Sequence, residues 1–466
     1  MKKIISFIAV VLSMIMLCSA FGCGGSTRDG LLVTISDNQR DIEIQYALQN
    51  AFVDYMKEKG TEVKVSYNTY TSSTYSKDLL NLQAGNKLGD VIQTSDSLAP
   101  LFAYKKVFEP LDEFISEDDS FDLSAYDSDI IESARAYENK LYYMPRSYDQ
   151  VVIFINTDFF DTLGVEYPKP DTSADDPWAW WTWDKCIELC QEIRQKVADH
   201  SKYGAVQDKI FPMDANIFWN PVYNAIIKSF GGKTVEVGDT VTTGFNSTDP
   251  LYSKTLKAIE FIKYLSVNNF TTSSNDTRFL SKVGGKSGIS SAGMWFTTRP
   301  NVLTCLNNEI KLAFAPIPRF TQNQTQQAEN TTYVGYGSAG YAVSAKSSQK
   351  TLAWEFVKFC ASEQGQKIIS GNGASVPTLN SLKNNPDASW KEPVKVNNAV
   401  VDQSAFIYDG LTRALAIYAR GVNAEVEYNI YQTVQSKIIS GIKKEEQTPA
   451  LLCSSIYDTI KDYLKK

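Results

Sequence analysis

The sequence has a single histidine, His200, and it lies in a polar stretch. A Ser-His-Asp triad and a multi-histidine metal site both need histidine beside other reactive groups, so each lacks a part here. We therefore expect no catalytic residues, no metal site and no cofactor, and the sequence favours a protein that is not an enzyme. A hydrolase acting on glycans needs only two suitably spaced carboxylates, so that alternative stays open.

Positive charge is also scarce. The chain has 46 lysines and arginines against 53 aspartates and glutamates, which gives a formal charge of −7. If the N-terminal leader with Lys2 and Lys3 is removed, 44 basic residues remain and the charge becomes −9. An acidic surface repels phosphate backbones, so nucleic acid is not expected as a partner.

Long apolar runs are rare, and the clearest one lies at the N-terminus. Lys2 and Lys3 precede the apolar run Ile4 to Leu17, and small residues follow it. The run is too short to span a membrane comfortably and is typical of a secretory signal peptide, which we place at residues 1–22.

Cys23 follows small residues and precedes a Gly/Ser linker, a pattern that resembles a bacterial lipobox. The resemblance implies a lipoprotein with lipidation at Cys23, a linker over residues 23–30, and an extracytoplasmic location on the cell membrane. Leucine is usual at the position of Ala20, so plain secretion stays open.

Cysteines are few, and they do not suggest a disulfide framework. Cys18 leaves with the leader and Cys23 would carry lipid, so an odd number of five remains. Cys186 and Cys190 are four residues apart, on one face of a predicted helix, and Cys360 lies in another apolar helical stripe. We expect these three to be buried thiols.

The segment from Lys140 to Asp184 organises the rest of the chain. Val151 to Asn156 is a nearly continuous apolar run, typical of a strand buried on both faces. A short helical turn follows and ends at Gly164, and Thr182 is placed to cap a helix over Lys185 to Val197.

The first part of the mature chain alternates strands and helices. Strands are expected over Leu31 to Ser36, over Val63 to Tyr67 and before Thr94, with helices between them, which predicts a parallel sheet. Ligands bind beyond the carboxyl ends of such strands. This edge holds Asp37, Asn38, Gln39, Ser95 and Asp96. Asp96 is the best polar candidate, because one carboxylate accepts two hydrogen bonds from adjacent hydroxyls; a helix N-cap for residues 97–104 is the alternative.

Several segments in consistent order resemble the maltose-binding-like family of extracellular solute-binding proteins, which serve ABC importers. They include the Lys140 to Asp184 segment and the helix at Lys350 to Ala361, which is followed by Ser362 and the turn Val376-Pro377-Thr378. The resemblance implies an α/β, two-lobed, periplasmic-binding-protein-like fold of type II, with crossing hinge strands. We expect lobe 1 over residues 31–148 and 334–382, and lobe 2 over 149–333 and 383–466.

The same resemblance points to aromatic ligand-binding residues, since indole and phenol rings offer flat apolar faces with a polar edge. Trp219 and Trp295 are the strongest candidates. Phe218, Phe296, Arg299, Tyr148 and Tyr336 complete the predicted set. The residues around Trp219 are also at helical spacing, so a core role is the alternative. Three tryptophans of the insert, Trp178, Trp180 and Trp181, could cover the cleft mouth or fill the lobe surface.

One motif is misleading. Gly335 to Gly340 fits G-x-G-x-x-G, but a dinucleotide site needs those glycines between a strand and a helix, whereas the chain continues as a strand.

The resemblance therefore implies a substrate-binding lipoprotein of an ABC transporter. It would capture a carbohydrate, and an oligosaccharide in particular, between two lobes by hinge closure and deliver it to a membrane permease. We expect a monomer with a small-molecule carbohydrate ligand, permease partners and a lipid anchor. A secreted glycan-active hydrolase, or a surface receptor for a non-sugar solute, is the alternative.

Overall fold

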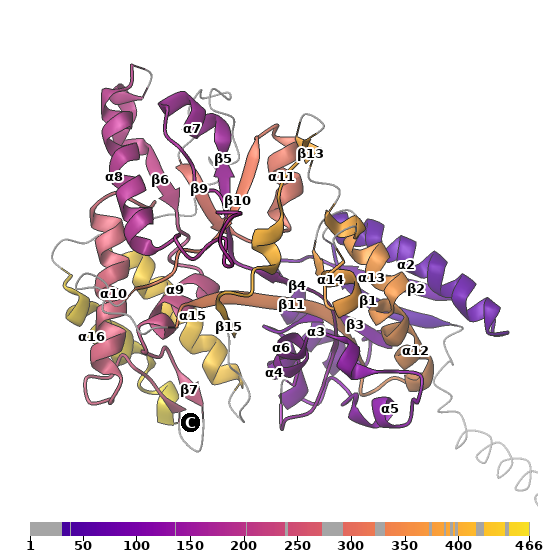
Figure 1. The fold of residues 1–466 in the computed structure, drawn as a ribbon. Coiled ribbons are helices and arrows are strands. Elements are labelled where there is room, and N and C mark those ends of the chain that lie inside the picture. Colours follow the sequence, from indigo (N-terminus) through magenta and orange to yellow (C-terminus); the bar gives the residue numbers. More distant parts are fainter. Residues whose placement is uncertain are drawn as a thin grey trace, which may run out of the picture.

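The computed structural model describes residues 30–465 except 38, 136, 202, 238–240, 273–291, 322–330, 372–374, 386–387, 392–394, 397–398, 416–423 and 443–446. The described chain forms two α/β lobes, each built on its own sheet, and a long strand crosses between them (Figure 1). The two-lobed α/β fold predicted from the sequence is therefore confirmed. The exact lobe boundaries stay a prediction.

The first lobe is built on a seven-stranded sheet. Six strands follow the order β12, β4, β11, β3, β1 and β2, and β15 pairs with the outer end of β11. Their bounds are β12 (Val376–Pro377), β4 (Met144–Gln150), β11 (Tyr333–Val343), β3 (Val91–Ser95), β1 (Leu31–Ser36), β2 (Val65–Tyr70) and β15 (Thr412–Leu415).

The predicted parallel pairing is found among the first three strands. β1 lies between β2 and β3 and is parallel to both, whereas β11 is antiparallel to β3 and β4. The second strand begins and ends later than the sequence predicted, at Val65 and Tyr70, because its polar outer residues still pair along the whole length of β1. Gly335 to Gly340 lies inside β11, as expected for a strand and not for a phosphate-binding turn.

Helices cover the first sheet and bury its apolar side chains. They are α2 (Gln39–Glu58), α3 (Tyr75–Ala84), α4 (Ala99–Tyr104), α5 (Asp112–Ser116), α6 (Ser128–Ser133), α12 (Lys350–Ala361), α13 (Glu363–Ser370) and α14 (Asn380–Lys383), with the short 3-10 turn η1 (Leu123–Ala125). In α2, Leu48 and Phe52 lie four residues apart and are fully buried, and Phe52 contacts Phe356 of α12 edge to face. This aromatic packing joins α2 to α12 over the core.

The second lobe is built on a four-stranded sheet in the order β10, β5, β9, β6. The strands are β10 (Leu312–Pro316), β5 (Val152–Asn156), β9 (Ala292–Thr297) and β6 (Phe211–Asp214), and a separate small hairpin joins β7 (Glu236–Val237) to β8 (Val241–Thr242). Every residue of β5 is buried, and β5 lies between β9 and β10. The apolar run therefore forms a strand buried on both faces, as its sequence predicted.

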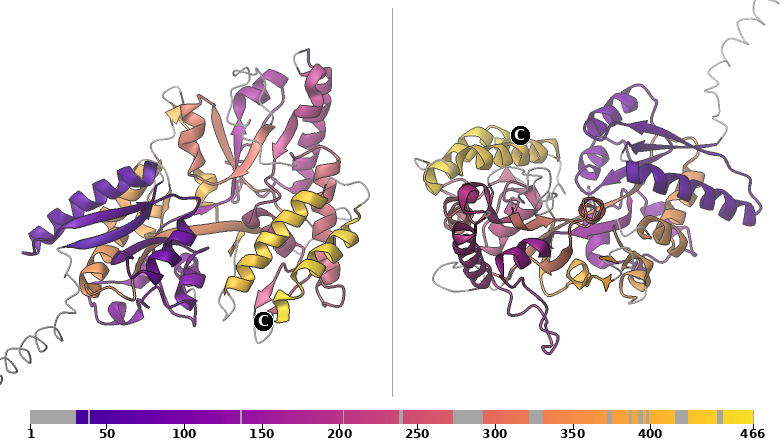
Figure 2. Two further views of the ribbon diagram at one scale, coloured as in Figure 1. Left: turned by 180° about the vertical axis from the view of Figure 1, so that it is seen from behind. Right: turned by 90° about the horizontal axis from the view of Figure 1, so that it is seen from above.

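The helices of this lobe are α7 (Thr157–Leu163), α8 (Trp183–Asp199), α9 (Asn220–Ser229), α10 (Tyr252–Val267), α11 (Asn301–Asn307), α15 (Ala424–Gly441) and α16 (Pro449–Ile460), with η2 (Gly204–Lys209) and η6 (Tyr463–Lys465). Figure 2 shows α15 and α16 side by side on the outside of the lobe. The expected local signals hold: Gly164 ends α7 in the left-handed conformation, and the Thr182 hydroxyl accepts a hydrogen bond from the Lys185 amide at the start of α8.

Three segments connect the lobes. Val151 joins β4 to β5, β11 passes between the lobes, and the return segment carries η4 (Ser389–Lys391), β13 (Lys395–Val396), β14 (Ala399–Val400) and η5 (Ser404–Ile407). A separate apolar cluster packs where they meet. It combines Tyr148 and Val376 of the first sheet with Phe154 of the second, and with Trp390 and Phe406 of the return segment.

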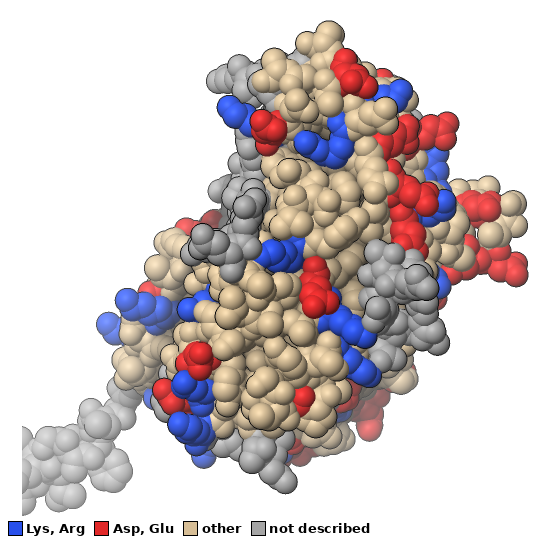
Figure 3. All heavy atoms as spheres, turned by 90° about the vertical axis from the view of Figure 1, so that its left-hand side faces the viewer, with Lys and Arg blue, Asp and Glu red and all other residues tan. Residues whose placement is uncertain are grey.

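The remaining expectations concern cysteines, tryptophans and charge. Cys186, Cys190 and Cys360 are buried free thiols, as predicted, and Cys305 and Cys453 are buried as well. Trp178 and Trp181 fill the core of the second lobe, whereas Trp180 is 41% exposed. On the outer face of this lobe, the described basic side chains lie in small groups with acidic ones among them (Figure 3).

None of the helices in the described ranges is long and apolar enough to cross a membrane.

Candidate ligand-binding cavity between the lobes

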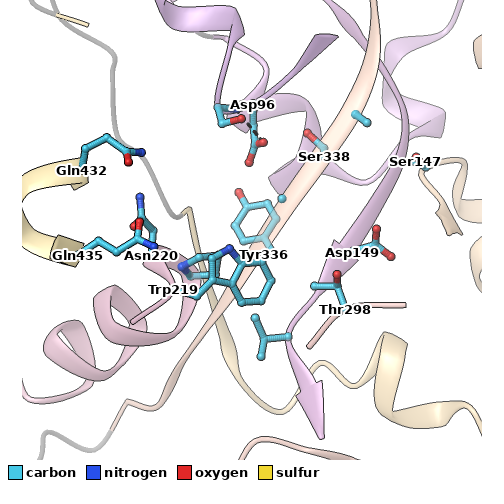
Figure 4. A pocket seen from close by; sticks show the side chains of 15 residues that line it. Asp96, Ser147, Asp149, Trp219, Asn220, Thr298, Tyr336, Ser338, Gln432 and Gln435 are labelled. Atoms are coloured by element: carbon cyan, nitrogen blue, oxygen red, sulfur yellow. Dashed lines mark hydrogen bonds between the residues drawn. The ribbon is translucent and has the colours of Figure 1, made fainter. Parts of the chain in front are cut away.

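A cavity of about 450 Å³ lies between the two sheets. Its fifteen lining residues come from both lobes and from the strand that crosses between them (Figure 4). They are Asp96, Ser97, Ser147, Asp149, Val151, Trp219, Asn220, Pro221, Thr298, Tyr336, Gly337, Ser338, Ala339, Gln432 and Gln435. A cavity of this size at a lobe interface has the dimensions and the location typical of a small-molecule site.

The first-lobe wall is polar and is fixed by the sheet. Asp96 follows directly after β3, and its amide donates to the Ser338 carbonyl of β11 at 3.1 Å. A Cβ atom added to Gly337 would lie 3.2 Å from Oδ2 of Asp96, so a glycine at this position lets the carboxylate lie close against the crossing strand. Strand β4, on the other side of β11, contributes Ser147 and Asp149.

Asp96 is half-buried, and this burial controls its acidity. Removal from water raises its pKa to about 7, although the Ser97 amide, which donates to Oδ1 at 2.8 Å, partly opposes the rise. The alternative role of Asp96, as a helix N-cap, is not observed, because α4 begins at Ala99 with Leu98 as its cap residue. The carboxylate therefore faces the cavity without serving the helix.

The second-lobe wall carries an aromatic side chain and amides. Trp219 is half-buried at the residue before α9, where Pro221 favours the first helical turn. Asn220 belongs to the same turn, and Gln432 and Gln435 extend from α15 (Figure 4). Tyr336 of β11 presents its ring to the cavity while its hydroxyl donates to the Asp129 carbonyl at 3.4 Å. The cavity thus combines two aromatic rings with carboxylate, amide and hydroxyl groups.

Three predicted site residues, Asp96, Trp219 and Tyr336, line this cavity together. Ser95 lies beside it, with its hydroxyl 2.8 Å from that of Ser97. Asp37 is exposed and its Oδ1 accepts from the amide and the hydroxyl of Ser72, bonds that lower its pKa. Asn38 lies outside the described residues, and so does the side chain of Gln39, the first residue of α2.

Four predicted residues lie in the interior and do not line the cavity. Phe218 and Phe296 are packed in the core of the second lobe. Tyr148 is 1% exposed, with the Arg413 guanidinium 5.1 Å from its ring centre. On β4 the neighbours of Tyr148, Ser147 and Asp149, line the cavity, and the Tyr148 ring lies in the apolar cluster between the lobes.

Arg299 is the fourth of these residues, and it is fully buried. Its guanidinium lies 4.9 Å from the Trp390 ring and 4.8 Å from the Phe406 ring, and Nη2 donates to the Trp390 carbonyl at 2.6 Å. Burial lowers its pKa to about 9, and the negative charge of Asp149 opposes that shift. Arg299 therefore ties the end of β9 to the return segment, behind the cavity wall.

Trp295 is half-buried but lies on a different surface. It pairs with Phe154 across β9 and β5, so the two side chains share one face of the sheet, with ring centres 6.2 Å apart. That face packs against the cluster between the lobes and does not line the cavity.

Sequence reasoning missed most polar lining residues: Ser97, Ser147, Asp149, Asn220, Ser338, Gln432 and Gln435. The Asn220-Pro221 helix start, directly after Trp219, could have suggested the first of the second-lobe amides. Gln432 and Gln435, three residues apart, only indicate a polar helix face. In the described part of the chain, no group of three or more histidine, cysteine, aspartate or glutamate residues is placed to hold a metal ion.

A sequence profile of the bacterial extracellular solute-binding protein family matches residues 41–367. The chain belongs to this family. The match covers the second sheet and the strands β2, β3, β4 and β11 of the first, and it includes the cavity residues from Asp96 to Ala339.

Solved structures of the same fold cover nearly the whole chain. The ABC substrate-binding protein Lmo0181 from Listeria monocytogenes, in complex with cycloalternan, is 17% identical, with a TM-score of 0.67, over 94% of this chain and 99% of its own. The GacH receptor of Streptomyces glaucescens, studied with acarbose, is 19% identical, with a TM-score of 0.66, over 94% and 99%. UgpB from Mycobacterium tuberculosis, in complex with glycerophosphocholine, is 15% identical, with a TM-score of 0.67, over 94% and 98%. At these identities the likeness establishes the fold alone.

Proposed function

We propose that the protein is the substrate-binding component of an ABC importer and that it captures a carbohydrate, in particular an oligosaccharide, in the cavity between its lobes. The observation that carries this proposal is the composition of the cavity. The faces of Trp219 and Tyr336 suit the C–H faces of sugar rings, and the carboxylates and amides around them suit hydroxyl groups. Cycloalternan and acarbose in the complexes of two structural relatives agree with it.

Capture would proceed by closure of the lobes around the ligand. The lining residues come from both lobes, and the connections at Val151 and β11 supply the hinge about which the lobes rotate. Closure would surround the sugar and present the closed form to a membrane permease. In this proposal the lobes are residues 31–148 with 334–382, and 149–333 with 383–466, and the protein acts as a monomer without cofactor or catalysis.

The proposal places the protein outside the cytoplasm, with residues 1–22 removed and Cys23 lipidated. Replacing Cys23 by alanine should move the protein from the membrane fraction to the surrounding medium or periplasm. Continued membrane association of the Cys23→Ala variant would contradict the lipid anchor while leaving the binding function untouched.

A thermal-shift screen of the mature protein from Gly24 tests the carbohydrate assignment. Mono- and oligosaccharides form the test set, with amino acids, peptides and polyamines as controls. A ligand at one hundred times its dissociation constant adds about 2.7 kcal/mol to stability, which is readily detected. A stabilisation seen with an oligosaccharide series supports the proposal, and one seen only among the controls contradicts it.

A glycan-active hydrolase is the second candidate, because Asp96 and Asp149 place two carboxylates in one cavity. Incubating the protein with the oligosaccharides that bind, and following their masses, separates the two functions. The transport proposal predicts that they are recovered intact, and their cleavage by the wild type but not by an Asp96→Asn variant would establish the hydrolase.

A further inference from the structure

The charged residues that line the cavity are all acidic. Asp96 and Asp149 both line it, and none of its fifteen lining residues is lysine, arginine or histidine. The negative charge of Asp149 interacts with the buried guanidinium of Arg299, which lies behind the cavity wall. Both carboxylates belong to the first-lobe wall, one on each side of β11, so an enclosed ligand lies against two acidic side chains.

Asp96 is the less compensated of the two carboxylates. It is surrounded by the Ser97 amide, the Ser338 backbone and the phenols of Tyr143 and Tyr336. None of the described cationic side chains forms an ion pair with it. A carboxylate offers more acceptor sites than the Ser97 amide uses, so donors or positive charge on a bound ligand can replace the water that closure removes from it.

An anionic substituent has the opposite effect. Lobe closure removes water from the cavity, and a carboxylate or phosphate on the ligand would then lie near Asp96 or Asp149 with no lining cation to balance it. Like charges brought together at a desolvated interface cost several-fold to many-fold in affinity. An amino group would instead meet carboxylates and the faces of Trp219 and Tyr336, an arrangement that attracts cations.

We propose that the cavity selects its ligands by charge, accepting neutral and amino-substituted sugars and rejecting sugars that carry a carboxylate or a phosphate, with Asp96 as the specificity-determining residue. This inference rests on the proposed carbohydrate function and narrows its substrate class. It also gives Asp96 two roles. Its carboxylate accepts hydrogen bonds from ligand hydroxyl groups, and its negative charge disfavours anionic ligands.

Trisaccharides that differ only in charge test the inference. The β-1,4 set is cellotriose, its 2-amino counterpart from chitosan and its 6-carboxylated counterpart, and the α-1,4 set is maltotriose with its 6-carboxylated form. Titration calorimetry on the wild type at about pH 8, where Asp96 is mostly ionised, should show the carboxylated form binding at least about ten-fold more weakly than the neutral form, with the amino form binding no more weakly than the neutral one. Equal affinity for neutral and carboxylated forms overturns the inference.

The variant Asp96→Asn assigns the effect to this residue. In this variant the affinities for the neutral and the carboxylated trisaccharide should differ by no more than about three-fold, because one of the two negative charges is gone. Asp54→Asn, an exposed position on α2, is the matched control and should leave the ratio unchanged. An unchanged ratio in Asp96→Asn contradicts the role of Asp96, and the wild-type comparison decides the charge rule even if this variant binds poorly.

The outcomes separate the two proposals. Equal binding of neutral and carboxylated trisaccharides contradicts the charge rule and leaves the carbohydrate function standing. If none of the sugars binds and a non-sugar control stabilises the protein instead, the carbohydrate function fails, and the inference built on it fails too.

Discussion

Two aspartates of the first lobe show how surroundings decide what a carboxylate does. Asp127, at the start of α6, is 5% exposed and is held by Lys383 at 2.6 Å and Arg413 at 2.9 Å. Asp96, at the end of β3, lines the cavity, and none of the described cations forms an ion pair with it. The first carboxylate joins parts of the structure, and the second faces the cavity.

Their pKa values move in opposite directions, although burial raises the pKa of both. Burial alone raises the pKa of Asp127, but the hydrogen bond from Lys383 and the charge of Arg413 more than offset it, so the pKa lies below the usual range. At Asp96 burial dominates and raises the pKa to about 7. Compensation by cations therefore distinguishes a structural aspartate from a candidate binding aspartate in this fold.

The largest expected effect is on stability, from Asp127→Asn. Asparagine keeps the hydrogen bonds that the side chain accepts from the amides of Asp129 and Ile130 but leaves Lys383 and Arg413 without their shared carboxylate. Breaking a buried ion pair from one side costs about 3–5 kcal/mol, which urea unfolding measures. Because the folded-state pKa is depressed, the wild-type contribution is present above the unfolded pKa of 3.8 and is lost as the pH falls through the folded-state pKa. A free energy of unfolding equal to that of the wild type would show that Asp127 contributes nothing.

The next effect is on binding, from Trp219→Ala. Loss of the ring should cost about 1–3 kcal/mol of affinity for the oligosaccharide that stabilises the wild type in the thermal-shift screen, with little change in apo stability. Trp180→Ala is the matched control, since Trp180 is also a tryptophan of the second lobe, is 41% exposed and does not line the cavity. Equal affinity of Trp219→Ala and Trp180→Ala would exclude ring stacking at Trp219.

Trp295→Ala should lower the stability of the protein and leave its sugar affinity unchanged, the opposite of Trp219→Ala. Its ring packs against Phe154 and the cluster between the lobes, so its removal leaves a void and costs about 2 kcal/mol or more of stability. Thermal unfolding without ligand measures this loss. If Trp295→Ala were as stable as the wild type but bound sugar more weakly, Trp295 would belong to the binding site and the prediction would be wrong.

A smaller effect, on pH dependence, comes from Asp96→Asn. The raised pKa of Asp96 means that its contribution to stability is fully present below its unfolded value of 3.8 and is lost as the pH rises through about 7. The wild type without ligand should therefore lose more stability than Asp96→Asn between these pH values. Tyr143, Tyr336 and Asp149 are the other titratable groups near or across the cavity, and they stay unchanged in the comparison. Parallel stability profiles would contradict the raised pKa.

The smallest effect is expected at Asp37. This exposed side chain accepts hydrogen bonds from the amide and the hydroxyl of Ser72, and it does not line the cavity. Asp37→Asn should leave the unfolding midpoint and the sugar affinity at their wild-type values. Weaker binding would indicate that Asp37 reaches the ligand when the lobes close.

The sequence predicted the fold better than the site. The apolar run at Val151 to Asn156, the N-cap at Thr182 and the stop at Gly164 are local signals, so the strand and the helices follow from the residues that form them. Asp96 was found because the ends of parallel strands meet at one edge of a sheet.

The other cavity residues depend on contacts between distant parts of the chain. Gln432 and Gln435 reach the cavity because α15 packs beside it, and the sequence around them does not predict where α15 packs. Trp295 and Phe296 alternate across β9, but the sequence does not say that one side faces the lobe core and the other the cluster between lobes. Arg299 was expected near a ligand as a polar neighbour of Trp295, whereas the rings of Trp390 and Phe406 enclose it.

The central claim is that one ligand contacts both lobes at once in the cavity, and hydrogen–deuterium exchange tests it most directly. Exchange is compared with and without the oligosaccharide that gives the largest thermal shift. The account predicts slower exchange both in the peptide that holds Asp96 and Ser97 and in the peptide that holds Trp219 and Asn220, because these segments form opposite walls. Protection confined to one lobe, or to a surface away from these segments, would contradict it.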